Sequence, residues 1–460
     1  MKKGFGRAFS VQTGRTTPGT RLTDGSRVAV IGGGPAGSFF SYFLLDMAER
    51  VRLDVGVDIY EPRDFSRPAP HGCNMCGGVV SESLVQYLAA EGINLPPTVV
   101  QRGIDSYMLH MDVGSKRIET PLNEKRIAAV HRGGGPRSIQ VKRWDSFDGY
   151  LLNLAQEKGA QVVNERVQAV DWLDGRPHIQ VREGMSQDYD MLVVASGVNA
   201  SIFRRLEGIG TEYKPPLTTK SAIREYHLGM DRIAEHFGSS FHVFLLDLPR
   251  LEFAAIIPKG DYVTVILLGE SIDNELLGNF LNTQPVKSCF PPEWKWEDLA
   301  CNCSPRINIR GSARPYGDRI VFIGDCGVTR LFKDGIGAAY RTAKAAAATA
   351  VFEGLSERDF ERHFGKACRE IERDNSIGKL IFMVVRLIQK LRFARGAMLR
   401  MVAAEQQRAG GDQPMSNVLW DTFTGSAAYS NIFLRTMHPL FLAKFVGNAA
   451  VSIFQRHQTA

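Results

Sequence analysis

The sequence predicts an α/β protein with an inserted, mostly antiparallel β domain and a C-terminal helical region. Three observations predict this class. A strand–glycine turn–helix–strand pattern spans residues 27–61, strands of period two fill residues 217–303, and helical patterns dominate from Phe360 onward. With 460 residues, of which 44% are hydrophobic, the chain is long enough for two or three domains with ample cores.

The first of these patterns has the order that a Rossmann-like dinucleotide site requires. An apolar run over 27–31 precedes the glycine-rich turn, a helix is expected over 38–50 and a strand over 54–60, and Glu61 follows that strand. Gly32 permits the tight turn, Gly34 lets a pyrophosphate approach the helix N-terminus, and Gly37 lets the helix lie close to the sheet. Pro35 and Ala36 complete the turn, and Glu61 is placed to accept hydrogen bonds from ribose hydroxyls. A glycine-rich turn without a ligand is the alternative.

Two later buried strands extend the same site. The strand over 189–195 ends in a turn that contains Gly197, and the strand over 319–323 ends in Gly324 and Asp325. Asp325 is placed to bind a ribityl hydroxyl, unless it only caps a turn. Gly335, Ile336 and Gly337 open a helix expected over 338–352, whose N-terminus would stabilise negative charge on a reduced flavin. Because no second GxGxxG occurs at such a junction, the sequence predicts one tightly held FAD.

The domain organisation follows from these patterns. We expect a disordered basic arm over 1–26 and an FAD-binding domain made of 27–105, 139–205 and 304–352. A substrate-binding sheet is expected over 106–138 and 206–303, with short strands at 106–112, 117–120 and 127–131. Residues 353–460 are expected to be helical, with one long amphipathic pattern over 376–407.

The net charge of +7 is concentrated in the last part of the chain. From Ser376 onward, ten Lys and Arg residues stand among aliphatic and aromatic residues, against only three acids. This pattern favours an anionic membrane surface over nucleic acid, for which no motif is visible. A helix packed on the flavin domain and a dimer interface are the alternatives. The N-terminal arm lacks the apolar core of a signal peptide, and no run of about 18 apolar residues occurs. We therefore expect a cytoplasmic protein that is peripheral to the membrane.

The seven cysteines do not have the even count and spacing of a secreted disulfide framework. Cys73 and Cys76 form a CxxC pair, which could be a redox dithiol. They could also be half of a zinc site that is completed by Cys301 and Cys303, although a CxC second pair is unusual. Four histidines lie outside any motif and are expected to be loop, core or surface residues: His71, His110, His131 and His227.

Taken together, the turn at 32–37, Glu61, the turn at 195–201 and Gly324–Asp325 resemble flavoproteins of the para-hydroxybenzoate hydroxylase fold. Within that fold, Cys76 to Ser81 resembles the Cys-x-Gly-Gly signature of geranylgeranyl reductases. Phe253 to Asp261 is similar to that family's substrate-sheet motif, with Ile257 where Phe is usual and Ala255 where Trp is usual. Arg143, Phe147 and Leu151 match the family's helix before the third strand.

The resemblance implies an FAD-dependent enzyme that reduces C=C double bonds of a polyprenyl lipid. It places Cys76, Gly77 and Gly78 at the flavin face, where Cys76 tunes the flavin or supplies a proton, or merely packs. It assigns Phe253, Ile257 and Pro258 to the substrate. Pro62, Arg63, Arg143 and Val167 join the residues above as expected FAD contacts. The electron donor, NAD(P)H or a ferredoxin-type partner protein, stays open.

Two other functions remain open for the same residues. One is a flavin monooxygenase or halogenase of the same fold, against which the Cys-Gly-Gly stretch argues. The other is a membrane-bound module that passes electrons to quinone. Relatives of such modules tend to carry an iron–sulfur cluster, and the cysteine spacing here does not suggest one.

Overall fold

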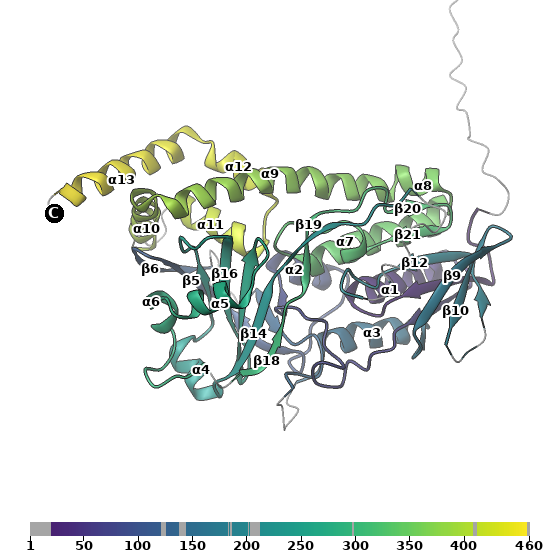
Figure 1. The fold of residues 1–460 in the computed structure, drawn as a ribbon. Coiled ribbons are helices and arrows are strands. Elements are labelled where there is room, and N and C mark those ends of the chain that lie inside the picture. Colours follow the sequence, from purple (N-terminus) through teal and green to yellow (C-terminus); the bar gives the residue numbers. More distant parts are fainter. Residues whose placement is uncertain are drawn as a thin grey trace, which may run out of the picture.

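The structure is a computed structural model that describes residues 20–120, 126–137, 144–182, 184, 186–200, 202, 212–296, 299–407 and 412–457. Two bodies built on β-sheets lie side by side, and a layer of C-terminal helices runs over both of them (Figure 1). Arg143, the strand expected over 139–143 and residues 1–19 of the expected arm lie outside the described residues.

The first body is built on a six-stranded sheet. Its order is β20 (Tyr316–Gly317), β21 (Ile320–Phe322), β12 (Met191–Val194), β1 (Ser26–Ile31), β2 (Val55–Tyr60) and β8 (Gln161–Val163), and all pairs except β20–β21 are parallel. Its strands are nearly continuous apolar runs because both faces are covered. Val28 and Val30 of β1 share a core with residues of α1 (Pro35–Arg50), α3 (Phe147–Glu157) and α7 (Gly335–Ala348). Ala29 and Ile31 share a core with residues of β9 (Val167–Leu173) and β10 (Arg176–Val181).

The predicted fold class is therefore confirmed, with small shifts at element ends. Helix α1 begins at Pro35 rather than Ser38, because proline suits the first helical position, where no intrahelical N–H bond is needed. The hairpin expected after residue 167 is present, and the short strand β11 (Gln187–Asp188) extends it to three strands. Helix α7 begins at Gly335, and a π-helical turn over Thr349–Glu353 follows it.

The second body is built on a seven-stranded sheet. Its order is β18 (Leu299–Cys303), β14 (Ala222–His227), β17 (Tyr262–Gly269), β16 (Leu251–Pro258), β15 (Ser240–Phe244), β5 (Ser106–Met111) and β6 (Gly114–Glu119). All neighbours are antiparallel except β15 and β5. Ala254 and Ile256 share a core with α4 (Met230–His236), α5 (Asn274–Leu281) and α6 (Gln284–Lys287). Phe253 and Ile257 belong to the core shared with the C-terminal helices.

Three expected boundaries are wrong. The strand expected in the substrate sheet near residue 127 is β7 (Ile127–Val130), which pairs with β3 (Val79–Val80) and β4 (Val100–Ile104) in a separate sheet, because its four apolar residues are buried between them. β19 (Arg306–Arg310) pairs with β13 (Leu217–Lys220), so the substrate-side strands continue past residue 304. The arm does not reach residue 26, because Leu22 is buried in the first core.

The C-terminal region is helical, as expected. It comprises α8 (Glu357–Arg362), α9 (Phe364–Lys390), α10 (Arg392–Gln406), α11 (Pro414–Thr424), α12 (Tyr429–Thr436) and α13 (Pro439–His457). The single pattern expected over 376–407 is two helices, because Leu391 adopts an extended backbone and separates α9 from α10. Trp420 Nε1 donates to Glu82 Oε2 of α2 (Glu82–Ala90) at 2.9 Å, and Tyr429 OH donates to Leu331 O at 2.6 Å. None of the described helices has the length and apolar composition needed to cross a bilayer.

Candidate functional site

The glycine-rich turn forms a tight backbone cradle between β1 and α1. Gly32 has φ +108°, and a Cβ placed on it would lie 2.6 Å from Ala195 O. A Cβ on Gly37 would overlap Gly32 O, so neither position accepts a side chain. Gly34 is the open position of the three, with Asn74 Nδ2 as its nearest neighbour at 3.4 Å. The first turn of α1 has no side-chain cap and no acidic residue, so its N–H groups suit an anionic group such as a pyrophosphate.

Glu61 directly follows β2 beside this cradle, but its carboxylate already accepts hydrogen bonds from the protein. It is 1% exposed and accepts hydrogen bonds from Gly33 N at 3.0 Å and from Arg63 N and Nε at 3.0 and 2.9 Å. Arg63 also donates to Asn74 Oδ1, while Pro62 between them is exposed. Glu61 therefore braces the turn in this structure, and a ribose could share its oxygens only if Arg63 moved. The expected role of Glu61 toward a ribose stays a prediction.

The strand-end residues expected at the flavin converge on the same cradle. A Cβ on Gly324 would lie 2.7 Å from Ala36 Cβ, so the Gly324–Asp325 turn packs directly on the first turn of α1. Asp325 Oδ1 lies 4.0 Å from the position of a Cβ on Gly335, at the start of α7. Gly197 has φ +71° and no atom within 4 Å of a Cβ built on it. Pieces that are far apart in sequence thus meet at one edge of the parallel sheet, as expected.

The Asp325 carboxylate is accessible to solvent, yet protein surrounds it on several sides. This desolvation raises the pKa of Asp325, and the nearby Arg132 charge opposes the shift. At the start of α7, Asp334 lies against Gly337 and accepts a hydrogen bond from Ser81 Oγ at 2.6 Å, while Ile336 is buried. Because Asp334 brings a carboxylate to this helix N-terminus, it partly offsets the positive end of the α7 dipole.

The Cys-Gly-Gly stretch lies against the substrate sheet. A Cβ on Gly77 would overlap Ile266 Cδ1 and lie 3.4 Å from Ile257 Cδ1. Gly78 has φ +71°, and a Cβ on it would overlap Val130 O and lie 3.2 Å from Lys259 Nζ. Glycine is therefore required at Gly78 by the backbone, whereas at Gly77 it is required by the closeness of two isoleucine side chains.

The predicted substrate residues fall on two faces of β16. Phe253 and Ile257 share the face that meets Gly77 and the C-terminal helices, where Phe253 stacks on Phe382 with ring centroids 6.0 Å apart. Pro258 follows Ile257 directly, so its side chain lies on the other face of the strand. The structure thus brings Phe253 and Ile257 together and separates Pro258 from them. Val167 is buried at the start of β9 in a core shared with Ile31 and Tyr60.

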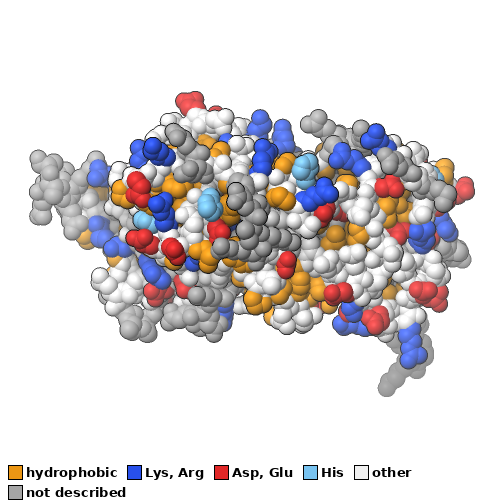
Figure 2. Space-filling view, turned by 90° about the horizontal axis from the view of Figure 1, so that it is seen from below, with side chains coloured by type: hydrophobic (Ala, Val, Ile, Leu, Met, Phe, Trp, Pro, Cys, Tyr) orange, Lys and Arg blue, Asp and Glu red, His pale blue; other side chains and the backbone are white. Residues whose placement is uncertain are grey.

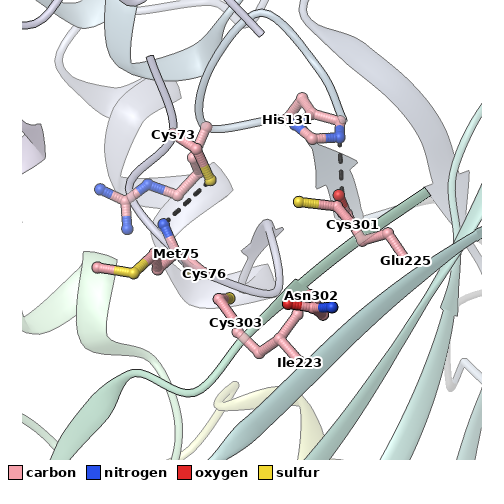
Figure 3. A pocket seen from close by; sticks show the side chains of 10 residues that line it. Cys73, Met75, Cys76, His131, Ile223, Glu225, Cys301, Asn302 and Cys303 are labelled. Atoms are coloured by element: carbon pink, nitrogen blue, oxygen red, sulfur yellow. Dashed lines mark hydrogen bonds and ion pairs between the residues drawn. The ribbon is translucent and has the colours of Figure 1, made fainter. Parts of the chain in front are cut away.

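A small pocket lies between the Cys73–Cys76 loop and strands β14 and β18 (Figure 3). Its volume is about 20 Å³, and it is lined by Cys73, Met75, Cys76, His131, Arg132, Ile223, Glu225, Cys301, Asn302 and Cys303. Burial raises the pKa of Cys73 to about 11 and that of Cys303 to about 12, so these thiols are protonated at neutral pH.

The four cysteines proposed as zinc ligands therefore meet in one pocket, but they do not form a close ligand set. Within the described ranges, the one group of three or more His, Cys, Asp and Glu residues with ligand atoms within 4.8 Å of one another is His110, His242 and Cys289. The structure therefore gives no support to a zinc site at the two cysteine pairs. His110, which was expected to be a core or surface residue, is buried and belongs to this group.

Two polar networks beside the pocket were not predicted from the sequence. Glu225 Oε1 accepts from Lys259 Nζ and from Thr264 Oγ1, both at 3.0 Å, and lies 3.5 Å from His131 Nε2. Burial lowers the pKa of His131 to about 4, with a smaller contribution from Lys259 in the same direction, so the imidazole is neutral at pH 7. Burial alone would raise the pKa of Glu225, but the Lys259 charge together with the smaller contributions of its other neighbours outweighs burial and lowers this pKa to about 2.

The second network joins the glycine-rich turn to the Cys-Gly-Gly stretch. Arg132 donates to Asp148 Oδ1 at 2.8 Å and contacts the Cys76 thiol, and Asn74 bridges Asp148 to Arg63. Burial disfavours the charged form of Arg132 and alone would lower its pKa. The neighbouring Asp148 and, to a smaller extent, Cys76 together outweigh this effect and raise the pKa of Arg132. A fixed cation thus stands beside Cys76 and near Asp325.

Comparison with known proteins supports the fold and nothing finer. No family model matches the chain, and no curated protein matches its sequence. Solved structures do match. A flavoprotein/dehydrogenase from Cytophaga hutchinsonii has a TM-score of 0.61 at 15% identity, over 94% of this chain and 99% of that one.

Two further solved structures are similar to this chain. The p-nitrophenol 4-monooxygenase PnpA from Pseudomonas putida DLL-E4 has a TM-score of 0.59 at 13% identity, over 88% of this chain and 99% of that one. The halogenase PltM, solved in complex with phloroglucinol and FAD, has a TM-score of 0.56 at 14% identity, over 95% of this chain and 93% of that one. The chain has the fold that these flavoproteins share.

Proposed function

We propose that the protein binds FAD and uses it to reduce C=C double bonds of a polyprenyl lipid. One observation supports a lipid as the substrate class: Gly77 of the Cys-Gly-Gly stretch packs closely against Ile257 and Ile266 of the substrate sheet. This contact places an apolar surface next to the loop that the resemblance assigns to the flavin face. An isoprenoid chain carries no charge to bind, so aliphatic side chains are the chemistry that would recognise it.

The residues around the cradle fit FAD. Gly34 leaves the backbone open to a pyrophosphate at the N-terminus of α1, while Gly32 and Gly37 let the turn close tightly. Asp325 and Gly335 lie close together beside this cradle and would hold the ribityl chain and the flavin ring, and PltM of the same fold was solved with FAD. When bound and reduced, FAD supplies the hydride. The chain's own residues position the double bond and exclude water from it.

The proton that completes the reduction requires a donor near the apolar surface. Arg132 lies beside the Cys76 thiol, and Lys259 Nζ is 3.2 Å from the position of a Cβ on Gly78. Cys76 and Lys259 are therefore the two candidate donors in the described site. Glu225 accepts a hydrogen bond from the Lys259 ammonium, and His131 is buried beside this pair.

The C-terminal helices support access to a lipid. Of the twenty large hydrophobic side chains that are exposed in the described residues, twelve lie between Leu380 and Ile453. On α9, Leu380, Met383, Val384 and Leu387 follow one helix face, and Lys379 and Lys390 flank it. The opposite helix face buries Phe382 and Val385 against the protein. An amphipathic helix with apolar and basic residues on its outer side suits an anionic membrane surface.

Figure 2 views the protein from the side opposite to the helical layer, where basic and acidic side chains are both present among hydrophobic ones. We propose a peripheral protein that touches the membrane through its C-terminal helices. Electrons would come from NAD(P)H or from a ferredoxin-type protein.

The experiment that tests this function compares products made with and without oxygen. Purified protein is incubated with a geranylgeranyl lipid in anionic vesicles and with dithionite, NADPH or reduced ferredoxin, under argon and in air. The proposal expects a gain of two hydrogens per double bond under argon. A product that forms only in air and gains oxygen or halogen would favour the monooxygenase and halogenase function that the names of PnpA and PltM suggest.

A further inference from the structure

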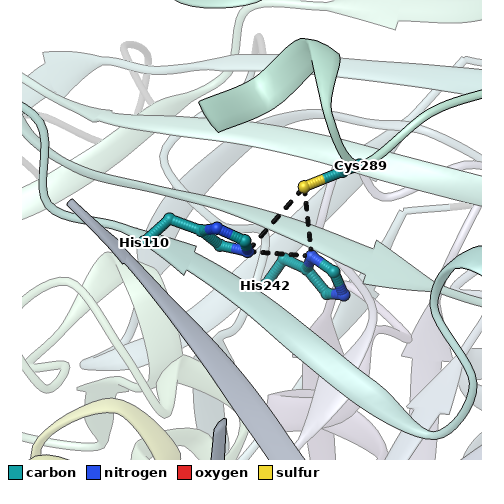
Figure 4. A group of neighbouring side chains, drawn as sticks. All are labelled: His110, His242 and Cys289. Atoms are coloured by element: carbon teal, nitrogen blue, oxygen red, sulfur yellow. Dashed lines mark hydrogen bonds between the residues drawn. The ribbon is translucent and has the colours of Figure 1, made fainter. Parts of the chain in front are cut away.

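A buried cluster of two imidazoles and a thiol lies in the second body, apart from the site described above (Figure 4). His110 comes from β5, His242 from β15, and Cys289 follows the short helix α6. Their exposed fractions are 4, 5 and 5%. Strands β5 and β15 are parallel neighbours, whereas Cys289 reaches them from a segment that is distant in sequence.

The three ligand atoms converge on one point. His110 Nε2 lies 3.0 Å from His242 Nδ1, His242 Nδ1 lies 3.3 Å from Cys289 Sγ, and Cys289 Sγ lies 3.7 Å from His110 Nε2. In a tetrahedral site with Zn–N of about 2.0 Å and Zn–S of about 2.3 Å, the two nitrogens are roughly 3.3 Å apart and each lies roughly 3.5 Å from the sulfur. The triangle in this structure therefore has the dimensions of three corners of a zinc tetrahedron.

The surroundings orient the ligands. His110 Nδ1 lies 2.7 Å from Ser115 Oγ, so the tautomer that donates to this hydroxyl leaves a lone pair on Nε2, which faces the cluster. The His110 ring stacks on Phe244 with centroids 4.5 Å apart, and Phe237 lies 4.9 Å from His242. Burial lowers the pKa of His110 to about 4 and that of His242 to about 3, so both imidazoles are in the neutral form that binds metals.

We propose that His110, His242 and Cys289 bind a Zn²⁺ ion, with the fourth tetrahedral position taken by water or another small donor. Binding breaks the Cys289 S–H bond, forms the Zn–S bond and releases one proton to solvent, with no change of oxidation state. Burial raises the pKa of Cys289 to about 12, so the metal must displace this proton.

The ion would have a structural role. Leu109 and Val243 belong to the core shared with the C-terminal helices, and strand alternation puts His110 and His242 on the opposite face of the sheet. This face is turned away from Gly77 and Ile257. The zinc would therefore tie the Gln284–Phe290 segment to β5 and β15 without reaching the proposed flavin site. Loss of zinc and loss of lipid reduction are thus separate outcomes.

The test measures zinc in the full-length holoprotein. Wild-type protein and the variants Cys289→Ser, His110→Gln, Cys303→Ser and Cys368→Ser are produced with added zinc, washed with a weak chelator and analysed for metal per protein. Cys368 is a matched control, because it is also buried and lies in α9, away from the cluster. Retained flavin absorption and near-ultraviolet circular dichroism confirm that each variant is folded.

We expect about one zinc per chain in the wild type, Cys303→Ser and Cys368→Ser, and at least a tenfold loss in Cys289→Ser and His110→Gln. Zinc-edge X-ray absorption of the wild type should show one sulfur at about 2.3 Å and nitrogen or oxygen at about 2.0 Å. A zinc-free wild type overturns the proposal. So does zinc that persists in Cys289→Ser, or zinc that is lost from Cys303→Ser alone, because it would then belong to the four-cysteine pocket.

Discussion

Lys259 Nζ lies 3.0 Å from Glu225 Oε1, and the two side chains are 1 and 8% exposed. The pair joins β14 to the end of β16 directly beneath the Cys-Gly-Gly stretch. A buried ion pair of this kind costs solvation, but removing one partner leaves an uncompensated charge, which is worse. The pair therefore ties β14 to the end of β16 within the substrate sheet, beside the proposed flavin face.

Replacing Lys259 with Met should lower the free energy of unfolding by about 3–5 kcal/mol, because Glu225 would stay buried without its cation. Urea unfolding measures the change. The double variant Lys259→Met/Glu225→Gln should recover part of the loss, and Lys287→Met, at an exposed position of α6, should change little. Equal stability of wild type and Lys259→Met would show that the pair does not hold the two strands.

His131 should make the protein less stable as the pH falls from 7 toward 4.5. Its folded pKa of about 4 lies below the ordinary value of about 6.5, so the unfolded chain takes up the proton first. The stability present above pH 6.5 is lost progressively toward pH 4, by up to about 3 kcal/mol. Glu225, with a pKa of about 2, stays ionised through this window, and its own contribution falls away only below its unfolded pKa of about 4.3.

His131→Gln should remove this part of the pH dependence, measured as urea midpoints at pH 7 and 4.5. His227→Gln is the control, because His227 is exposed at the end of β14. A pH dependence that is the same in wild type and His131→Gln would contradict the assignment.

Gly77→Ala should slow lipid reduction at least tenfold, because the new methyl group would overlap Ile266 Cδ1 and push the turn away from the sheet. Ile266→Val removes that Cδ1 atom, so the double variant should regain most of the rate. The measurement is the rate of saturated product formed by each of the four proteins. Additive losses in the double variant would mean that the contact does not govern the rate.

Met383→Glu/Leu387→Glu should weaken binding to anionic vesicles at least tenfold, because each large side chain contributes about 1.5–3 kcal/mol when it leaves water. Vesicle flotation measures the bound fraction. The control is Leu173→Glu, since Leu173 is similarly exposed but lies on the β9 hairpin of the first body. Reduction of a detergent-dissolved lipid should survive the double change, whereas vesicle binding that survives it would place the membrane contact elsewhere.

The features that depend on local sequence signals could be predicted from the sequence. The glycine pattern at 32–37, the strand-end Asp325 and the start of α7 at Gly335 are local signals, and each lies where expected. Leu391 ends α9 without proline or glycine, so tertiary packing rather than propensity decides this break. The sheet to which β7 belongs depends on pairing partners that are far away in the chain, which periodicity does not specify.

The site was predicted less completely than the fold. Lys259, Glu225 and His131 stand in strands or loops without a motif, and only the fold brings them together. The cluster of His110, His242 and Cys289 joins residues with separations of more than 40 positions, so no spacing rule marks it. Pro258 belonged to a motif, yet strand alternation turns it away from Ile257.

The most direct test of the proposed function is an anaerobic single turnover. The purified flavoprotein is reduced with dithionite, excess reductant is removed, and a geranylgeranyl lipid is added while the flavin spectrum and the lipid mass are followed. Gly37→Ala, whose methyl group would overlap Gly32 O, should fail to hold FAD, whereas Gly278→Ala, with open space around it, should behave as the wild type. The account predicts flavin reoxidation coupled to a gain of two hydrogens in the lipid. A flavin that stays reduced with every lipid offered, yet reoxidises with quinone or oxygen, would contradict it.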